Sequence, residues 1–379
     1  MEEYIKHREE YIKTFFKNIT DKEINKFLDI SYLSKQKRLK VEDFEYLSDI
    51  FSGKMTARKL LTKNKKIYNP LETLLIMSDY VYYPIQVLKS EFQEFIYYRT
   101  NNEESSRFIV YYNLENNIII VSFRGTKTRE DAKLNIKFYR KETSMIDDDT
   151  KDDFFKWREE KRESGGLSNF TFPLENDREI EVHKGFQDNA KELYSPLKRV
   201  ILKIVESFKE KNPQNLDKIN LIFTGHSLGG ATAFIMSIYF AILFRKNKLP
   251  IKRHVVTYGS PPIGNKNFHL LYYYFDNSYY VRVANNKDYA CTIGTEGFYI
   301  TKKIRHIDML TKNVCILQDI NEKTSNNDKE SQLFYIDTNS LVDKQIEKMT
   351  KENDRLKPKL GKIYHSFYVF GKNSKLMFL

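Results

Sequence analysis

The most pronounced hydrophobic pattern in the chain is a short apolar run that begins at Leu221 and is followed, after a turn, by the long apolar stretch 231–244. The turn between them has the sequence Gly-His-Ser-Leu-Gly at positions 225–229. A short apolar run bounded by glycine predicts a buried strand, whereas the longer apolar stretch predicts a helix. This part of the chain is therefore expected to form a strand, a G-x-S-x-G turn and a helix.

Other apolar patterns predict further strands and helices on both sides of this unit. Residues 186–208 carry apolar side chains at helical spacing, which predicts an amphipathic helix leading into the strand. Apolar residues at 108–112 and before Phe123 predict two strands joined by a turn at 113–117, preceded by a helical pattern over 71–96. Strands and helices are therefore expected on both sides of the Ser227 turn.

The two ends of the chain differ in composition from this central part. Residues 1–66 are rich in Lys and Glu with apolar residues at helical spacing, which predicts an N-terminal helical extension. Residues 67–379 are expected to form one domain, because α/β domains often exceed about 250 residues. Two polar insertions interrupt that domain at about 139–180 and 321–359.

The insertion at 139–180 contains an acidic, aromatic segment around the only tryptophan of the chain, Trp157. If the segment is helical, Phe154 and Trp157 share one face with charged residues opposite. Such a helix could lie at a lipid interface. Alternatively, it could be a solvated helix whose aromatic side chains pack on the core.

The G-x-S-x-G turn makes Ser227 a candidate nucleophile. A serine on a tight turn between a strand and a helix is lifted clear of the backbone, and the two elements hold it rigidly. Gly225 and Gly229 are expected there because a Cβ at either position would clash with the neighbouring strand or helix. The alternative is an ordinary glycine-rich turn without a catalytic role.

A serine nucleophile needs an acid and a base, and in α/β-hydrolases these follow it in the order Asp or Glu, then His. Asp288 follows a short predicted strand, so its side chain could reach the carboxyl edge of the sheet, although it could also be a solvated turn residue. His306 and His365 come after it, and the order permits either as the base. Structural roles are expected for the earlier histidines His226, His254 and His269.

Five motifs, in order, resemble those of class 3 lipases, the family of fungal triacylglycerol lipases and their plant and animal relatives. They are an apolar strand ending in F-R-G-[ST], the motif V-H-x-G-F, the segment T-[FY]-G-x-P-x-x-G-[ND], the motif R-V-x-x-x-x-D and a late H-x-x-Y. In this chain they occupy residues 119–126, 182–186, 257–265, 282–288 and 365–368. The resemblance implies a lipase-type activity and an α/β-hydrolase fold, in which helices flank a mostly parallel central sheet.

The resemblance also implies roles for individual residues. Asp288 matches the acid of the family's catalytic triad and His365 matches the base, whereas His306 fits a second, structural histidine. Thr126 matches the residue that helps to form the oxyanion hole, where the backbone N–H of Leu228 is the expected second donor. His183 matches a structural position of the family.

One family feature is altered in this sequence. After F-R-G-[ST] the family has a short lid segment that usually carries an aromatic residue and then Asp-Leu. Here Ala132 and Asn135 occupy those places. Any lid contacts are therefore expected to differ from those of the family.

Composition excludes several other classes of protein. The 63 Lys and Arg against 51 Asp and Glu give a net charge of +12, but these charges are interleaved along the chain, so no nucleic-acid partner is expected. A basic surface could instead favour anionic membranes. Cys291 and Cys315 are expected to be reduced, and no metal or nucleotide motif predicts a cofactor.

The sequence predicts neither a signal peptide nor a transmembrane helix. The first ten residues lack the apolar core of a signal peptide. The stretch 231–244 is shorter than a membrane span and is explained by a buried helix. A cytoplasmic or peripheral membrane location is expected.

Taken together, the motifs predict a serine hydrolase that cleaves carboxylic esters of lipids through an acyl-enzyme. Its expected partners are a lipid ester substrate and, transiently, a membrane or lipid-droplet surface. A phospholipase, a lysophospholipase or an acyltransferase could use the same triad. A lipid-binding module without activity is the non-enzymatic alternative.

Overall fold

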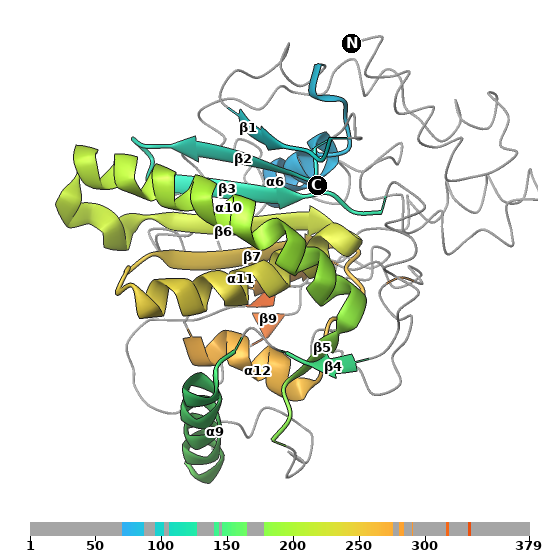
Figure 1. Cartoon of the computed structure of the whole chain (residues 1–379), viewed down its shortest axis with the longest axis vertical. Helices are drawn as coiled ribbons and strands as arrows, with labels where there is room; N and C mark the ends of the chain where they lie inside the picture. Colours follow the sequence, from blue (N-terminus) through green and yellow to red (C-terminus); the bar gives the residue numbers. More distant parts are fainter. Residues whose placement is uncertain are drawn as a thin grey trace, which may run out of the picture.

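The computed structural model describes residues 70–86, 95–101, 106–126, 140–143, 146–164, 178–275, 280–283, 290, 316–317 and 333–334. Its centre is a six-stranded sheet in the order β1-β2-β3-β6-β7-β8 (Figure 1). The strands are β1 Phe95–Tyr98, β2 Phe108–Asn113, β3 Ile118–Phe123, β6 Asn220–His226, β7 Lys252–Tyr258 and β8 Tyr280–Val283. Strands β1, β2 and β3 are antiparallel neighbours, whereas β3, β6, β7 and β8 run parallel.

Helices cover both faces of this sheet. The helices of the described residues are α6 Pro70–Tyr80, α9 Asp148–Glu163, α10 Lys184–Lys211, α11 Leu228–Lys246 and α12 Lys266–Phe275, with the short 3-10 helix η1 Pro213–Lys218. Helix α6 lies on one face, and α10 and α11 lie on the other (Figure 1). Helix α9 lies outside these layers, beyond α12 (Figure 1). Two small strand pairs join β4 Arg140–Glu142 to β5 Glu181–His183, and β9 Ile316–Leu317 to β10 Leu333–Phe334. The α/β-hydrolase fold predicted from the sequence is confirmed.

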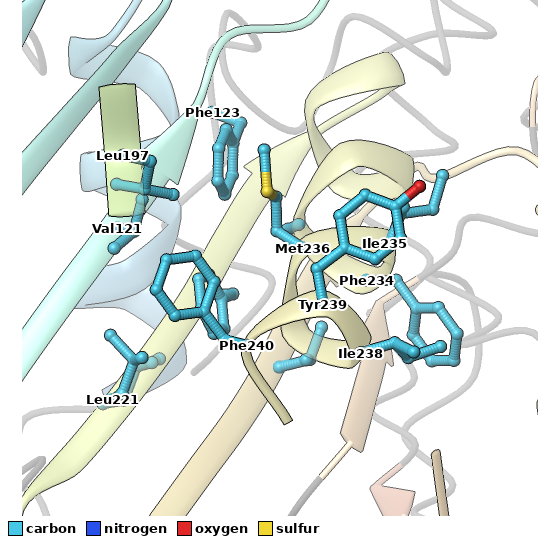
Figure 2. Close-up of a cluster of buried hydrophobic side chains, with 14 of the residues drawn as sticks. Val121, Phe123, Leu197, Leu221, Phe234, Ile235, Met236, Ile238, Tyr239 and Phe240 are labelled. Atoms are coloured by element: carbon cyan, nitrogen blue, oxygen red, sulfur yellow. The ribbon is translucent and has the colours of Figure 1, made fainter. Parts of the chain in front are cut away.

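The central strands and α11 form the core. Every residue of β3 and β6 is buried, as expected for strands covered on both faces. Figure 2 shows side chains of α11, among them Met236 and Phe240, packed toward β3, β6 and α10. Helix α11 is long and apolar enough to cross a membrane, but 94% of its most apolar window is buried inside the fold. The prediction of a buried core helix is confirmed, although the helix extends beyond the apolar run.

Helix α10 and the β2–β3 hairpin also match the elements predicted from the sequence. The apolar face of α10 is buried against the core through Phe186, Ala190, Leu193, Leu197, Ile201, Ile204, Val205 and Phe208. The β2–β3 hairpin closes through Asn113, whose Oδ1 accepts hydrogen bonds from the backbone N–H groups of Glu115 and Asn116 at 2.9 and 3.1 Å. Its last turn residue, Asn117, has a φ of 52°, a left-handed conformation that asparagine tolerates.

The helix predicted over 71–96 is too long. The helix α6 ends at Tyr80, and Ile96 lies in β1, where it pairs with Val110 of β2. Pro84 disfavours a helical conformation for the residue before it. The aromatic and β-branched residues that follow fit the pleated surface of an edge strand. A tertiary pairing therefore overrides the local helical pattern.

Several predicted segments lie outside the described residues. These are the N-terminal extension 1–66, most of the insertion 321–359, the lid positions Ala132 and Asn135, and both cysteines. The division into an extension and one larger domain stays a prediction.

The insertion at 139–180 contains α9, whose aromatic residues face the protein. Asp147 caps the helix, because its carboxylate accepts a hydrogen bond from the backbone N–H of Thr150 at 2.9 Å. Phe154 is completely buried, and its ring lies 6.0 Å from the ring of Trp157 and 5.7 Å from that of Tyr274 in α12. Of the two alternatives for this segment, packing on the protein core is the one that the structure supports.

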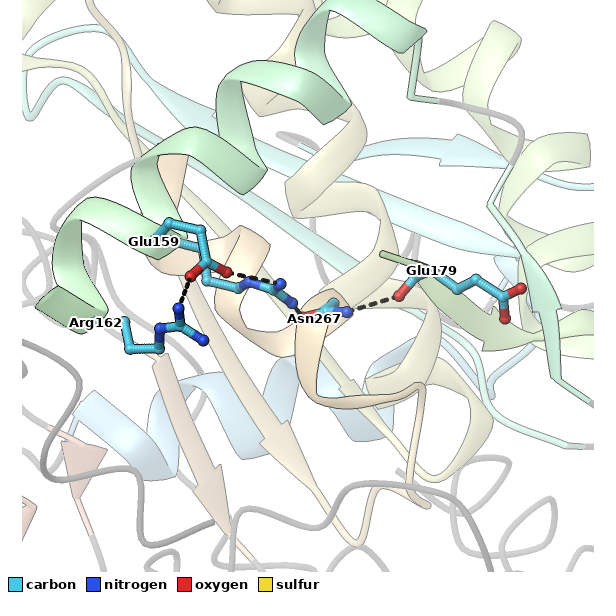
Figure 3. A network of polar contacts seen from close by, with 5 residues as sticks. Glu159, Arg162, Glu179 and Asn267 are labelled. Carbon is cyan, nitrogen blue, oxygen red and sulfur yellow. Dashed lines mark hydrogen bonds and ion pairs between the residues drawn. The ribbon is translucent and has the colours of Figure 1, made fainter. Parts of the chain in front are cut away.

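A buried arginine adds a polar link between α9 and α12, drawn in Figure 3. Arg158 donates from Nη1 to the Oδ1 of Asn267 at 2.8 Å, and Asn267 donates from Nδ2 to the carbonyl of Glu179 at 2.8 Å. Arg158 also pairs with Glu159 at 3.0 Å. Because a buried cation needs such partners, the network ties α9 to one site on α12.

The other end of α9 is linked to the C-terminal end of α11. Lys246 forms an ion pair with Asp147, and Arg245 lies 3.5 Å from Asp153. Helix α11 has 19 residues, and a rise of 1.5 Å per residue makes it about 28 Å long. Helix α9 therefore binds the end of α11 that lies farthest from Ser227.

This arrangement predicts a structural role for Phe154. Replacing Phe154 with Ala should lower the free energy of unfolding by about 3–5 kcal/mol, because it opens a cavity in a packed aromatic cluster. Urea unfolding measures this loss. The neighbouring exposed Lys156→Ala is the matched control and should change the free energy by less than about 0.5 kcal/mol.

A lid or interfacial role for the aromatic pair predicts a different result. Phe154→Ala would then leave the unfolding curve in place and slow hydrolysis of an emulsified ester far more than that of a soluble short-chain ester. That outcome would contradict the packing role assigned to α9.

Candidate active site

Ser227 occupies a sharp corner between β6 and α11. Its backbone has φ 58° and ψ −129°, a conformation that non-glycine residues adopt rarely and that costs about 1–3 kcal/mol. The Ser227 N–H donates to the carbonyl of Tyr258 in β7 at 2.9 Å, and the Ser227 carbonyl accepts from the N–H of Gly230 at 2.9 Å. The residue is therefore held by the sheet on one side and by the helix on the other, as a strained nucleophile turn requires.

The glycines on both sides of Ser227 allow three backbones to touch. A Cβ on Gly225 would meet backbone atoms of Gly229, and a Cβ on Gly229 would meet the carbonyl of Phe123 at the end of β3. Both contacts would be well under the 3.0 Å that real Cβ atoms keep. The clash predicted from the sequence is confirmed at both positions, so this corner accepts only glycine on either side of the serine.

The segment that follows β3 packs directly against Ser227. A Cβ on Gly125 would lie 2.5 Å from the carbonyl oxygen of His226 and 3.3 Å from the Cβ of Ser227. The next residue in the chain is Thr126. On the other side, Leu228 opens α11 and is 2% exposed. Its N–H is among the first of the helix, which have no acceptor within the helix. Segments 124–126 and 226–228 therefore meet at the serine.

The other predicted triad residues, Asp288 and His365, lie outside the described residues, as does His306. The preceding strand β8 is described, and it pairs Val283 with Tyr258 in the parallel register. Gly259, next after β7, donates its N–H to the carbonyl of Val283 at 2.8 Å. The chain therefore leaves β8 at the same edge of the sheet as Ser227, five residues before Asp288 in sequence. The acid and the base stay predictions.

A polar chain supports the first turn of α11 from the side of α10. Asn189 donates from Nδ2 to the Oγ1 of Thr232 at 2.8 Å, and Thr232 donates to the carbonyl of Leu228 at 2.9 Å. Arg107 donates from Nη2 to the Oδ1 of Asn189 at 2.6 Å, and its own carbonyl accepts from the N–H of Arg124 at 3.0 Å. Arg107 is thus bonded directly to the segment 124–126 and is linked to Leu228 through Asn189 and Thr232.

A second set of contacts reaches the site from α6 and from the turn that follows it, on the opposite face of the sheet. Ser78 Oγ lies 3.0 Å from Oγ1 of Thr224 in β6, and the Tyr82 hydroxyl lies 3.1 Å from Nδ1 of His226. Sequence reasoning did not single out Tyr82 or Asn189. The only signal was a polar residue at a buried helical position, since Asn189 lies three residues after Phe186 on the apolar face of α10.

Three of the earlier histidines, His183, His254 and His269, are buried, which fits the structural roles expected for them. Desolvation by burial lowers the pKa of His183 to about 4, and it lowers the pKa of His269 to about 3 with a smaller contribution from Arg282. His183 accepts a hydrogen bond from the N–H of Phe186 at 3.3 Å and so caps α10. His254 lies 3.1 Å from Asn220 through Nε2. Among the residues that the structure describes, no three His, Cys, Asp or Glu side chains form a metal site.

The motifs at 182–186 and 257–265 pack against each other and share backbone hydrogen bonds. The N–H of His183 donates to the carbonyl of Ile263 at 2.8 Å, and the N–H of Asn265 donates to the carbonyl of Glu181 at 3.0 Å. A Cβ on Gly264 would lie 2.5 Å from that same carbonyl. The V-H-x-G-F motif and the glycine of the 257–265 segment are therefore needed together for close packing rather than for chemistry.

Comparison with known proteins agrees with this geometry. Residues 120–297 match the family described as lipase (class 3). The match begins within β3 and covers the Ser227 turn and β8, and it confirms the resemblance to class 3 lipases that the motifs indicated. It supports a lipase-type ester hydrolase. Comparison with curated proteins gave no match.

Solved structures of fungal lipases resemble the chain. A triacylglyceride lipase of Rhizomucor miehei is 14% identical, with a TM-score of 0.45, over 85% of this chain and 98% of that one. A lipase of Rhizopus microsporus var. chinensis is 15% identical, with a TM-score of 0.44, over 86% and 91%. Lipase II of Rhizopus niveus is 14% identical, with a TM-score of 0.41, over 92% and 98%.

The lowered histidine pKa values predict a specific loss of stability in acid. His183 and His269 have folded pKa values of about 4 and about 3, below the usual 6.5. Their contribution is complete above pH 6.5 and is lost as the pH falls toward those values, because the unfolded chain then binds more protons. Each histidine should add up to about 1.4 kcal/mol per pH unit to the slope of the unfolding free energy.

His183→Asn isolates one of these contributions. Asparagine can still cap α10 but does not titrate. Urea unfolding between pH 7.5 and 4 should give a shallower pH dependence for this variant than for the wild-type protein. Parallel curves would mean that His183 binds its proton equally well in both states.

Proposed function

We propose that this protein is a serine hydrolase that cleaves carboxylic esters of lipids through an acyl-enzyme on Ser227. The main observation behind the proposal is the strained backbone of Ser227, at the point where segments 124–126 and 226–228 meet. Ser227 lies in the part of the chain that matches class 3 lipases. Strain of this kind persists only where the surrounding fold over-determines it, and it occurs often at active sites.

In the first half-reaction, Ser227 Oγ attacks the ester carbonyl while His365 accepts the hydroxyl proton. Asp288 orients the imidazole of His365 and stabilises its positive charge. The carbonyl π electrons move to oxygen and form a tetrahedral oxyanion. When the intermediate collapses, the C–O bond to the alcohol breaks, and His365 returns the proton to the leaving alcohol. The acyl group then remains on Ser227.

The oxyanion is stabilised by donors from the two segments beside Ser227. The backbone N–H groups of Leu228 and Thr126 are the proposed donors, with the Thr126 hydroxyl as a third. Loss of one such donor typically costs about 3 kcal/mol of transition-state stabilisation. The packing of Gly125 on Ser227 supports this assignment, because it brings the chain to Thr126 beside the nucleophile.

In the second half-reaction, water replaces the alcohol. His365 removes a proton from the water as it attacks the acyl carbon, and the bond to Ser227 Oγ breaks with return of that proton to the serine. The family match supports a lipid ester as substrate. A net charge of +12 is compatible with work at an anionic lipid surface, to which the protein would bind peripherally.

A fluorophosphonate probe tests the nucleophile and the base together. The wild-type protein should gain one phosphonyl group, mapped by mass spectrometry to Ser227. Ser227→Ala should lose the adduct and ester hydrolysis, with a loss on the order of 10⁶ in rate as for other triads. His365→Ala should also lose activity by several orders of magnitude, because Ser227 then lacks its base.

His306→Ala is the matched control for the base, and it should keep most of the activity. The reverse pattern, an active His365 variant and an inactive His306 variant, would exchange their roles. An adduct on another serine would overturn the assignment of Ser227. A wild-type protein that neither binds the probe nor hydrolyses esters would be the lipid-binding module without activity.

A further inference from the structure

The Tyr82 hydroxyl lies between the two segments that meet at Ser227. It is 3.1 Å from Nδ1 of His226, one residue before the nucleophile. The same hydroxyl lies where a Cβ on Gly125 would be, so it also packs on Gly125, one residue before Thr126. Tyr82 is 4% exposed. A single buried hydroxyl therefore contacts both segments that carry the proposed oxyanion donors.

These two segments need such a contact because the strand pairing between them stops short of the site. Strands β3 and β6 are paired only as far as Phe123 and Gly225. Beyond that point, residues 124–126 and 226–228 are held by other contacts, and the distance between their N–H groups is no longer set by the β ladder. An oxyanion hole requires donors about 2.7–3.1 Å from the oxyanion, so that distance matters for the rate.

The turn that carries Tyr82 is itself held in place. The N–H of Tyr82 donates to the carbonyl of Asp79 at 3.0 Å, and the hydroxyl of Tyr83 donates to the Asp79 carboxylate at 3.1 Å. One turn earlier, Ser78 contacts Thr224 of β6 at 3.0 Å. The Tyr82 ring therefore projects from a docked helix end rather than from a mobile loop.

We propose that Tyr82 is a positioning residue for the oxyanion hole, whose hydroxyl sets the spacing between the segments that end at Thr126 and Leu228. The proposal rests on the function proposed for Ser227. Tyr82 acts through the backbone of Gly125 and through the His226 side chain, and it takes no part in proton transfer. Its removal therefore affects stabilisation of the transition state and leaves ground-state binding of the ester unchanged.

Tyr82→Phe tests this role, because it removes only the hydroxyl and keeps the buried ring. On a soluble short-chain ester, kcat should fall by about tenfold or more while KM stays within about twofold, since small misplacements at an active site can cost about 10²-fold in rate. The rate of phosphonylation of Ser227 should fall by the same factor, because the phosphonyl oxygen occupies the oxyanion hole.

Ser78→Ala is the matched control. It removes a buried hydroxyl contact between α6, which ends two residues before Tyr82, and the same strand β6, at a position two residues farther from Ser227 than His226. Urea unfolding should show a loss of stability for both variants, whereas kcat should fall far more for Tyr82→Phe than for Ser78→Ala, in which the Asp79 contacts still hold the Tyr82 turn. Equal kcat values for Tyr82→Phe and Ser78→Ala would overturn the proposal, since a purely structural tyrosine gives that result.

His226→Phe removes the same hydrogen bond from the other partner and keeps an aromatic ring. It should lower kcat by a similar factor, and the double variant with Tyr82→Phe should be no slower than the slower single variant. If the losses of kcat in the two single variants added up in the double variant, a shared role of Tyr82 and His226 would be contradicted. If wild-type Ser227 reacts with the probe and Tyr82→Phe reacts equally fast, this inference alone fails. If wild-type Ser227 does not react, the proposed function fails as well.

Discussion

The contact between Gly229 and the carbonyl of Phe123 is the constraint on which the rest of the site depends. It brings the first turn of α11 against the end of β3, although the two lie more than 100 residues apart in sequence. Only a residue without a Cβ permits this approach. Because the backbones touch, the segment leading to Thr126 lies beside the nucleophile turn, in which Ser227 has a positive φ of 58°.

The fold supplies the free energy that keeps this strained corner in place. Helix α11 is buried from Leu228 to Phe244, and β6 is buried along its whole length. Polar contacts then orient the segments around Ser227 from both faces of the sheet. Tyr82 makes such a contact on the side of α6, and Asn189 makes one on the side of α10. Apolar burial gives stability without direction, whereas these hydrogen bonds orient individual backbone segments.

The central part of the fold and the nucleophile turn could be predicted from the sequence because their signals are local. Long apolar runs gave β6 and α11, and the flanking glycines gave the turn. The prediction of one helix over 71–96 was wrong because the end of this range forms a strand, in which the pairing of Ile96 with Val110 depends on tertiary structure. The amphipathic pattern of α9 indicated that one face of the helix is apolar, but it did not indicate that this face packs on α12. The role of Tyr82 was not predictable, since its partner His226 is 144 residues away.

The reaction of Gly229→Ala with a fluorophosphonate tests the backbone contact most directly, with Gly230→Ala as its neighbour control. A Cβ on Gly230 would lie 3.0 Å or more from its nearest neighbours, which small shifts can accommodate, whereas a Cβ on Gly229 would overlap the Phe123 carbonyl. Gly229→Ala should slow phosphonylation of Ser227 by about 10²-fold or more, and Gly230→Ala should slow it far less. Equal reactivity of Gly229→Ala and the wild-type protein would contradict the central role of the Gly229–Phe123 contact.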